Sequence, residues 1–408
     1  MNFRIAFIVS TFLLLLTVAC KHQNSVRENA DKIRFFENNL NVHITEDGKY
    51  KQSGEKATLK DRMAKAKAAG LSLTIIDNDK IEWQKSYGFL KNGFPEKVNK
   101  NTVFQTGSAC KFVTALIIMH YAEQGIFNLD ANINKYLTSW KMPVNEFNKN
   151  IPITIRHLLS HQSGLPGTNF ERDTTVELPT LPQILDAKYP AVNKPAYPTF
   201  TPGNKWAYSN IAYVVLQLIL EDAFQKPFTD IAREIIFTPL QMEHSTFDYP
   251  LPDSLATNMA YPHSSEGEPR KVVQDNKARA QGGMFSTSND MAKLLIEVME
   301  AYQGKSQKIV HQETIRKMFT PQISLPDEAF GVPLNNGLGI FLEGGDKYLS
   351  ILHPGHSYPG SYFFILAFPE TGQGLVLAQN DNSGDLLDLE IISALAELYN
   401  WPGGQYFK

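Results

Sequence analysis

The chain has 408 residues, and 43% of them are hydrophobic, which is enough to bury a large core. Its 39 Lys and Arg residues nearly balance 42 Asp and Glu residues, so the net charge at pH 7 is -3. No run of five or more basic residues occurs, so a nucleic-acid partner is not expected. The composition indicates a soluble globular protein.

The first 20 residues have the pattern of a secretion signal. Arg4 is followed by a mostly apolar run from Ile5 to Ala19, which is shorter than the roughly 20 residues needed to span a bilayer. The run ends at Thr17–Cys20, which resembles the bacterial lipoprotein box. We therefore expect export to the bacterial cell envelope (periplasm or outer membrane) and a lipid anchor on Cys20; the alternative is an ordinary cleaved signal with a chance cysteine.

Cys110 is the only cysteine besides Cys20. A single thiol cannot form an internal disulfide, so stability must come from the core. We expect Cys110 to be a small apolar residue packed inside a helix and not a reactive thiol.

The N-terminal third is predicted to contain a polar tether over residues 21–55 and then the start of a folded domain that spans residues 56–400. Leu59, Met63 and Ala66 fall on one face of a helix that Gly70 ends. Residues 71–89 contain two runs rich in β-forming residues, and 77–79, Asp-Asn-Asp, predict a turn between them.

The remainder of the domain changes from helical to strand-like patterns. Residues 106–334 are predicted to be a helical region, and residues 335–400 return to strand-like runs before a closing helix. Strands in 56–105 and 335–400 imply one antiparallel sheet from two distant parts of the chain. The predicted class is α/β (α+β), with terminal helices beside that sheet. The proline-rich stretch 168–202 is predicted to be a loop near a site.

Ser108 and Lys111 stand three residues apart at the start of an apolar helical pattern. This spacing places both side chains on one helical face, where a partly desolvated lysine can take up the proton of a serine hydroxyl. By itself the pair is weak, because a helix cap and a surface charge would have the same pattern.

Four further segments occur with it in a fixed order. They are residues 153–165 (ITIRHLLSHQSGL), the Tyr-x-Asn at Tyr208 and Asn210, residues 282–295 (GGMFSTSNDMAKLL) and residues 352–368 (LHPGHSYPGSYFFILAF). Together the five segments resemble the serine β-lactamase and penicillin-binding-protein superfamily. The similar branch includes class C β-lactamases, D,D-peptidases, D-aminopeptidases and esterases, and the resemblance covers roughly residues 57–400.

The resemblance implies roles for the matched residues. Ser108 would be the acylated nucleophile and Lys111 its proton partner. Tyr208 would act as a phenolate or as a proton relay. Asn210 would bind the acylamide carbonyl of the substrate, and it could also be the N-cap of the following helix. The backbone amides of Ser108 and His356 would form the oxyanion hole.

The third motif departs from the β-lactamase pattern. His353-Pro354-Gly355 stands where β-lactamases usually have Lys-Thr-Gly, so the cation is titratable and a hydroxyl donor is lost. We expect a carboxylate on the substrate to bind more weakly, by about 1 to 3 kcal/mol, and β-lactam hydrolysis to be inefficient. If His353 contacts the substrate as a cation, affinity for carboxylated ligands should fall as the pH rises through its pKa. The choice between His353 and His356 as the motif histidine stays open.

His157 and His161 have the spacing of helical zinc ligands but lack the accompanying glutamate, so we expect no metal and no cofactor. The predicted function is a serine hydrolase that forms an acyl-enzyme on Ser108 and hydrolyses an amide or ester. The alternatives are a D,D-carboxypeptidase or β-lactamase, and a penicillin-binding sensor or pseudoenzyme that does not turn over. The expected partners are a small acyl substrate and, through the lipid, a membrane.

Overall fold

The computed structural model describes residues 27–46, 49–167, 177–272, 277–326, 329, 332–345, 347–358, 360–381 and 384–402. The predicted signal and Cys20 lie outside these residues. The chain divides into two compact units, one formed by residues 1–66 with 385–408 and the other by residues 67–384. None of the helices in the described parts has the length and apolar character required to cross a bilayer.

The first unit contains regular structure where a tether was predicted. A helix covers residues 27–38, and β1 (Leu40–Glu46) pairs antiparallel with β2 (Lys49–Ala57). Helix α2 (Leu59–Ala66) follows, and the closing helix α11 (Gly384–Tyr399) belongs to the same unit over nearly all of its length. The prediction of a tether is therefore wrong for the described part of residues 21–55.

The polar character of this hairpin is explained by its partners, which lie far away in the sequence. The backbone amide of His43 donates to the Glu390 carboxylate at 3.1 Å, and Lys56 forms an ion pair with Glu397 at 2.8 Å. Arg62 forms a bidentate ion pair with Glu390, whose side chain is fully buried. Because these partners are more than 300 residues apart, no local pattern could reveal them.

The second unit is built on a sheet with the strand order β4-β3-β12-β11-β10-β9-β8-β7, in which every neighbouring pair is antiparallel. The strands are β3 (Gly70–Asp77), β4 (Lys80–Gly88), β7 (Ile323–Ser324), β8 (Asn335–Asn336), β9 (Phe341–Glu343), β10 (Ser350–Ser357), β11 (Ser361–Phe368) and β12 (Gln373–Gln379). The prediction of one sheet from two distant segments is confirmed.

The predicted hairpin is present as β3 and β4. Asn78 and Asp79 form its two-residue turn with φ values of 52° and 56°, a left-handed conformation that Asn and Asp tolerate well. Gly70 begins β3 and does not cap the preceding helix. Strand β11 is buried along its whole length, which explains its unbroken apolar sequence.

The helices of this unit lie mainly in the region predicted to be helical. They are α3 (Cys110–Glu123), α4 (Ile155–Leu159), α5 (Leu181–Asp186), α6 (Asn210–Phe224), α7 (Phe228–Ala232), α8 (Asp253–Ala256), α9 (Ser288–Tyr302) and α10 (Gln312–Met318). Short helical turns cover Gly107–Ala109 (η1), Ile133–Lys135 (η2) and Arg233–Phe237 (η3). The region is not entirely helical, because it also contains β6 (Phe285–Ser286), which pairs with β5 (Phe104–Gln105), and β7.

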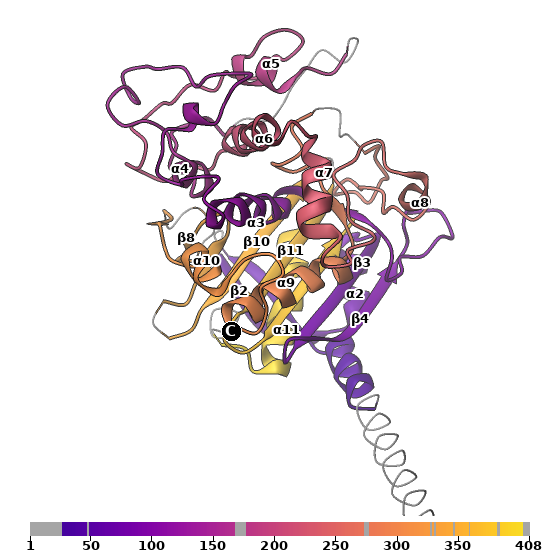
Figure 1. Cartoon of the computed structure of the whole chain (residues 1–408). Coiled ribbons are helices and arrows are strands. Elements are labelled where there is room, and N and C mark those ends of the chain that lie inside the picture. Colours follow the sequence, from indigo (N-terminus) through magenta and orange to yellow (C-terminus); the bar gives the residue numbers. More distant parts are fainter. Residues whose placement is uncertain are drawn as a thin grey trace, which may run out of the picture. The chain divides into compact units, whose positions relative to one another are not determined.

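One apolar core joins the helices to one face of the sheet. Alternate residues of β10, β11 and β12, such as Ile351, Phe363 and Val376, share this core with residues of α3, α6 and α9. Helix α9 packs across the sheet (Figure 1). Its Ser288 hydroxyl accepts a hydrogen bond from the Thr74 hydroxyl of β3 at 2.8 Å. Helices α3 and α6 are buried on almost all sides, so their position beside the sheet is fixed by packing.

Candidate active site

Ser108 lies in the short turn Gly107–Ala109 that leads directly into α3. It is not the N-cap of α3, because that position is Ala109 and has no side-chain cap. Its hydroxyl lies 2.9 Å from Nζ of Lys111, one turn further along. The structure therefore brings together the two residues that the spacing predicted to meet.

Lys111 is fully buried, unlike the surface charge of the alternative interpretation. Its Nζ donates to the backbone carbonyl of Gln281 and lies over the rings of Tyr208 and Tyr213, at 5.0 and 5.5 Å from their centroids. Burial lowers the pKa of Lys111 to about 7. A large share of the amine is thus neutral at pH 7 and has a lone pair that can accept the Ser108 proton.

Tyr208 completes the cluster, because its side chain interacts with that of Ser108 and Nζ of Lys111 lies over its ring. Burial raises the pKa of Tyr208 well above its usual range, and a largely neutral Lys111 supplies no permanent cation to oppose this. The surroundings of Tyr208 therefore disfavour a phenolate at neutral pH. A neutral phenol that receives and passes on a proton is consistent with the same geometry.

Asn210 is the first residue of α6 and is half-buried, two positions after Tyr208. The N-cap of α6 is Ser209, whose hydroxyl accepts from the amide of Ala212 at 3.1 Å. The alternative role of Asn210 as the helix cap is therefore wrong. Its predicted role in binding the substrate carbonyl stays a prediction.

Two glycines allow β10 to lie directly against the nucleophile turn. A Cβ atom on Gly355 would lie 2.0 Å from the carbonyl oxygen of Thr106, and one on Gly107 would lie 2.5 Å from the carbonyl oxygen of His356. Gly107 also has φ 49°, which favours glycine. The His356 backbone is consequently adjacent to the residue before Ser108, and its role as an oxyanion donor stays a prediction.

The two histidines of the third motif point to opposite faces of β10, as residues at odd separation in a strand do. His353 is buried, and its ring stacks on Phe341 with 4.9 Å between centroids. It interacts electrostatically with Lys111, so its ring is the one on the site side. His356 is exposed, and its ring packs edge-on against Tyr362 at 4.7 Å.

The surroundings of His353 disfavour the cation on which the predicted pH dependence of carboxylate binding was conditional. Burial and the nearby Lys111 lower its pKa to about 3, so the imidazole is neutral at neutral pH. Nδ1 of His353 donates to the carbonyl of Pro354 at 2.7 Å, which leaves the lone pair on Nε2. The third motif thus presents neither a permanent charge nor a hydroxyl to a substrate carboxylate.

The other predicted residues have structural surroundings. Cys110 is fully buried, as expected, and burial raises the pKa of its thiol to about 11. His157 caps α4 together with Thr154, whereas His161 lies beyond the end of that helix. No group of three or more metal-ligating side chains occurs among the described residues.

Two features of this cluster were not predicted from the sequence. The first is the carbonyl of Gln281, which accepts a hydrogen bond from Lys111 and comes just before the Gly-Gly pair of the segment 282–295. Nothing in a sequence marks a backbone acceptor. Trp206 bonds through its ring N–H to Oδ1 of Asn336 at 2.9 Å and packs beside Tyr208. Its place next to the Tyr-x-Asn motif was the available signal.

The described side chains can therefore perform general-base chemistry on a hydroxyl. A serine, a neutral amine and a neutral phenol are in mutual contact, with close-packed backbone beside the nucleophile. None of the three groups needs to carry a charge before the reaction begins.

A family model described as Beta-lactamase matches residues 56–398. Among curated proteins, the chain is 26% identical over 288 residues to "Teichoic acid D-alanine hydrolase" of Staphylococcus aureus, covering 70% of this chain and 62% of that protein. It is 24% identical over 328 residues to "Protein flp" of Staphylococcus aureus (strain MW2), covering 79% and 61%. The chain thus spans about six tenths of the length of these relatives.

Solved structures show the same fold. The chain is similar to the octameric penicillin-binding protein homologue of Pyrococcus abyssi, with a TM-score of 0.68 and 24% identity over 84% of this chain and 76% of that one. A β-lactamase/D-alanine carboxypeptidase of Yersinia pestis, complexed with citrate, matches with a TM-score of 0.66 and 21% identity, covering 84% and 97%. The predicted β-lactamase/transpeptidase-like fold is confirmed.

Proposed function

Because the chain belongs to the Beta-lactamase family of serine hydrolases, we propose that it hydrolyses an ester or amide through an acyl-enzyme on Ser108. The observation that supports this most directly is the 2.9 Å contact between the Ser108 hydroxyl and the buried amine of Lys111. This contact joins a nucleophile to a base whose pKa is lowered to about 7.

In the first half-reaction, Nζ of Lys111 accepts the hydroxyl proton while Oγ of Ser108 forms a bond to the substrate carbonyl carbon. The backbone amides of Ser108 and His356 hold the oxygen that becomes negative. The bond to the leaving group then breaks, and the leaving group takes a proton that passes through the Tyr208 hydroxyl. In the second half-reaction, water attacks the carbonyl carbon of the acyl-enzyme and gives up a proton. That proton passes to Oγ as the bond from Oγ to the carbonyl carbon breaks and the acid is released.

The preferred substrate is an ester or amide whose leaving group has no carboxylate. His353 is neutral and Pro354 has no hydroxyl, so the third motif has little to hold such a carboxylate. One relative is named as a teichoic acid D-alanine hydrolase, which makes a D-alanine ester of a cell-envelope polymer the first substrate to try. The second candidate, a D,D-carboxypeptidase or β-lactamase, has support from the name of one solved relative.

The place of action is proposed from the N-terminal sequence. Export, a lipid on Cys20 and attachment to a bacterial envelope membrane would place this site beside cell-envelope polymers. Metabolic labelling with a fatty acid, compared between the full chain and Cys20→Ala, measures this directly. Equal labelling of the two would contradict it.

A substrate panel tests the proposed reaction. The protein without residues 1–20 is incubated with a p-nitrophenyl ester, a peptide ending in D-Ala-D-Ala and a chromogenic cephalosporin, beside Ser108→Ala. We expect turnover of the ester to exceed that of the carboxylated substrates, and Ser108→Ala to lose roughly 1,000-fold or more. Ester turnover that survives in Ser108→Ala would refute the proposal, and a stable cephalosporin adduct without turnover would favour a sensor.

A further inference from the structure

His161 is a buried residue that contacts the catalytic cluster, although the reaction described above does not use it. It lies two residues beyond the end of α4, and 2% of its surface is exposed. Its backbone has φ 57°, a left-handed conformation that is uncommon for a non-glycine residue and that tends to occur at functional sites. Its contacts give this residue a definite role.

The contacts of His161 are directed to the two residues on either side of Tyr208. Its carbonyl oxygen accepts from the amide of Ala207 at 2.8 Å, and Nδ1 of its ring accepts from the amide of Ser209 at 3.1 Å. The ring itself packs against the Tyr208 ring with 4.3 Å between centroids. His161 thus binds the backbone on both sides of Tyr208 and also packs against one face of the Tyr208 ring.

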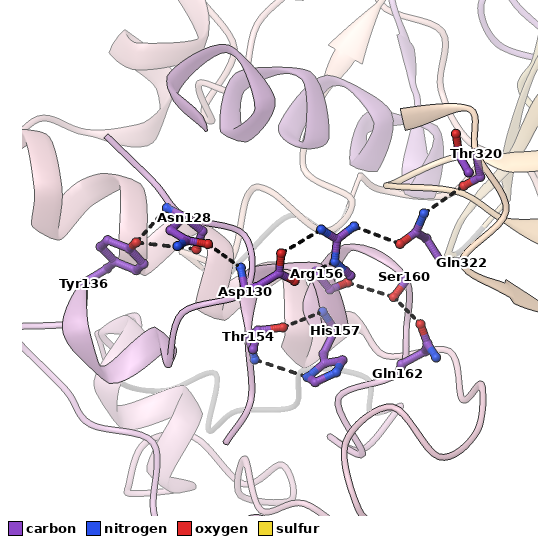
Figure 2. A network of polar contacts seen from close by, with 10 residues as sticks. All are labelled: Asn128, Asp130, Tyr136, Thr154, Arg156, His157, Ser160, Gln162, Thr320 and Gln322. Carbon is purple, nitrogen blue, oxygen red and sulfur yellow. Dashed lines mark hydrogen bonds and ion pairs between the residues drawn. The ribbon is translucent and has the colours of Figure 1, made fainter. Parts of the chain in front are cut away.

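The neighbours of His161 in the chain, Ser160 and Gln162, belong to the polar network around α4 that Figure 2 shows. Arg156 forms two hydrogen bonds to Asp130, at 2.7 and 2.9 Å. The Ser160 hydroxyl donates to the carbonyl of Arg156 and also contacts Oε1 of Gln162, each at 2.8 Å. The residues just before and just after His161 are therefore fixed to α4.

The bond from Ser209 also determines the protonation of the imidazole. Because Nδ1 accepts an amide N–H, it has no proton, so a neutral ring must carry its proton on Nε2. Burial, Lys111 and His353 all lower the pKa of His161. The remaining groups that face it are the rings of Tyr208, Tyr213 and Trp206, so within the described contacts no carboxylate opposes this.

We propose that His161 is a positioning residue for the reaction, which holds the Tyr208 hydroxyl on Ser108 through its carbonyl, its Nδ1 atom and its ring. This role rests on the proposed function of Ser108. Protonation of the ring would put a hydrogen on Nδ1, oppose the Ser209 amide and add charge beside Lys111. His161 therefore acts only as the neutral imidazole.

Two variants, His161→Asn and His161→Gln, carry the same amide group at different distances from the backbone, so they test whether the position of the acceptor atom matters. Asn places an oxygen near the location of Nδ1 and tolerates the left-handed backbone, whereas Gln carries the same amide one carbon further out. We expect His161→Gln and His161→Phe to lower kcat for a p-nitrophenyl ester by about 100-fold with little change in KM. His161→Asn should recover most of that loss.

His157→Ala, in the same segment, is the control. It should lower the melting temperature and leave kcat unchanged, because His157 caps α4.

The readout is the rate at which a fluorophosphonate labels Ser108, measured with kcat, KM and melting temperature. Slow labelling in the Gln and Phe variants, with recovery in the Asn variant, would support the positioning role. Equal rates in His161→Phe and the unmodified protein would overturn that role alone. If the unmodified protein neither turns over the ester nor is labelled at Ser108, the proposed function and this role both fall.

Discussion

Lys111 is the residue on which the proposed chemistry depends most. An ordinary lysine is charged at neutral pH and cannot accept a proton, but burial lowers the pKa of this one to about 7. The same burial explains why the neighbouring His353 is neutral and why Tyr208 keeps its proton. One apolar setting therefore produces a base, a neutral relay and a neutral third motif.

The pH dependence of kcat/KM tests this assignment. The active form of Lys111 is the neutral amine, whose fraction increases as pH rises, so kcat/KM for a neutral ester should rise through pH about 7 and then level off. His353→Gln is the matched control. His353, with a pKa of about 3, does not titrate in this range, so kcat/KM of the variant should rise over the same pH range. A profile that is flat from pH 5 to 9 would contradict the role of Lys111.

Some features of single residues in the site could be predicted from the sequence, and others could not. The Ser108–Lys111 spacing correctly indicated two side chains that meet, because short spacing on a helix fixes geometry. The charge states of His353 and Tyr208 were not accessible in the same way. They depend on burial by residues that are distant in sequence, such as Phe341.

At the scale of elements, the contact between β10 and the turn before α3 creates the site. Gly107 and Gly355 permit it, since each would place a Cβ atom into the opposite backbone. The pairing of β10 with β11 over seven residues fixes the strand in that position. The site is thus a property of two elements that are almost 250 residues apart.

Gly355→Ala tests the importance of this contact. Its Cβ would lie 2.0 Å from the Thr106 carbonyl oxygen, so β10 must move away from the nucleophile turn. We expect kcat to fall about 100-fold and the free energy of unfolding to fall by roughly 1 to 3 kcal/mol. Gly93→Asn is a suitable control, because a Cβ there meets no atom within 4 Å and Asn tolerates its φ of 82°. Full activity in Gly355→Ala would be inconsistent with the contact described.

Prediction of the elements succeeded where the pattern was local. The β3–β4 hairpin, α3, α6 and α9 were all visible in apolar periodicity and turn residues. It failed for β1, although Leu40, Val42 and Ile44 alternate as in a strand, and for β2, which is too polar to be read as one. Both strands have partners in α11. Short strands such as β6 and β7 have two residues each, too few for any pattern.

At the scale of the whole molecule, the two ends of the chain form a compact unit of their own. Among the ion pairs between its described residues, the most buried is Arg62–Glu390, in which the side chains are 11% and 0% exposed. Glu390 also accepts the amide of His43. A charge pair in such a setting is costly to break, because the remaining partner is left buried without compensation.

Glu390→Gln should lower the free energy of unfolding by about 3 kcal/mol, since Arg62 loses its counter-charge. Urea unfolding, followed by circular dichroism, measures this change. The control is Glu234→Gln, which breaks the exposed pair Lys226–Glu234 and should cost less than about 1 kcal/mol. Equal effects of the two variants would show that the ends of the chain are not stabilised by this ion pair.

The most direct test of the account is intact-protein mass spectrometry of the enzyme after rapid quenching with an activated ester. We expect one added acyl mass, located by peptide mapping on Ser108, and no such adduct in Ser108→Ala. The adduct should form more slowly below pH 7 in proportion to the protonation of Lys111. An adduct on any other residue, or ester turnover without an adduct on Ser108, would contradict the account.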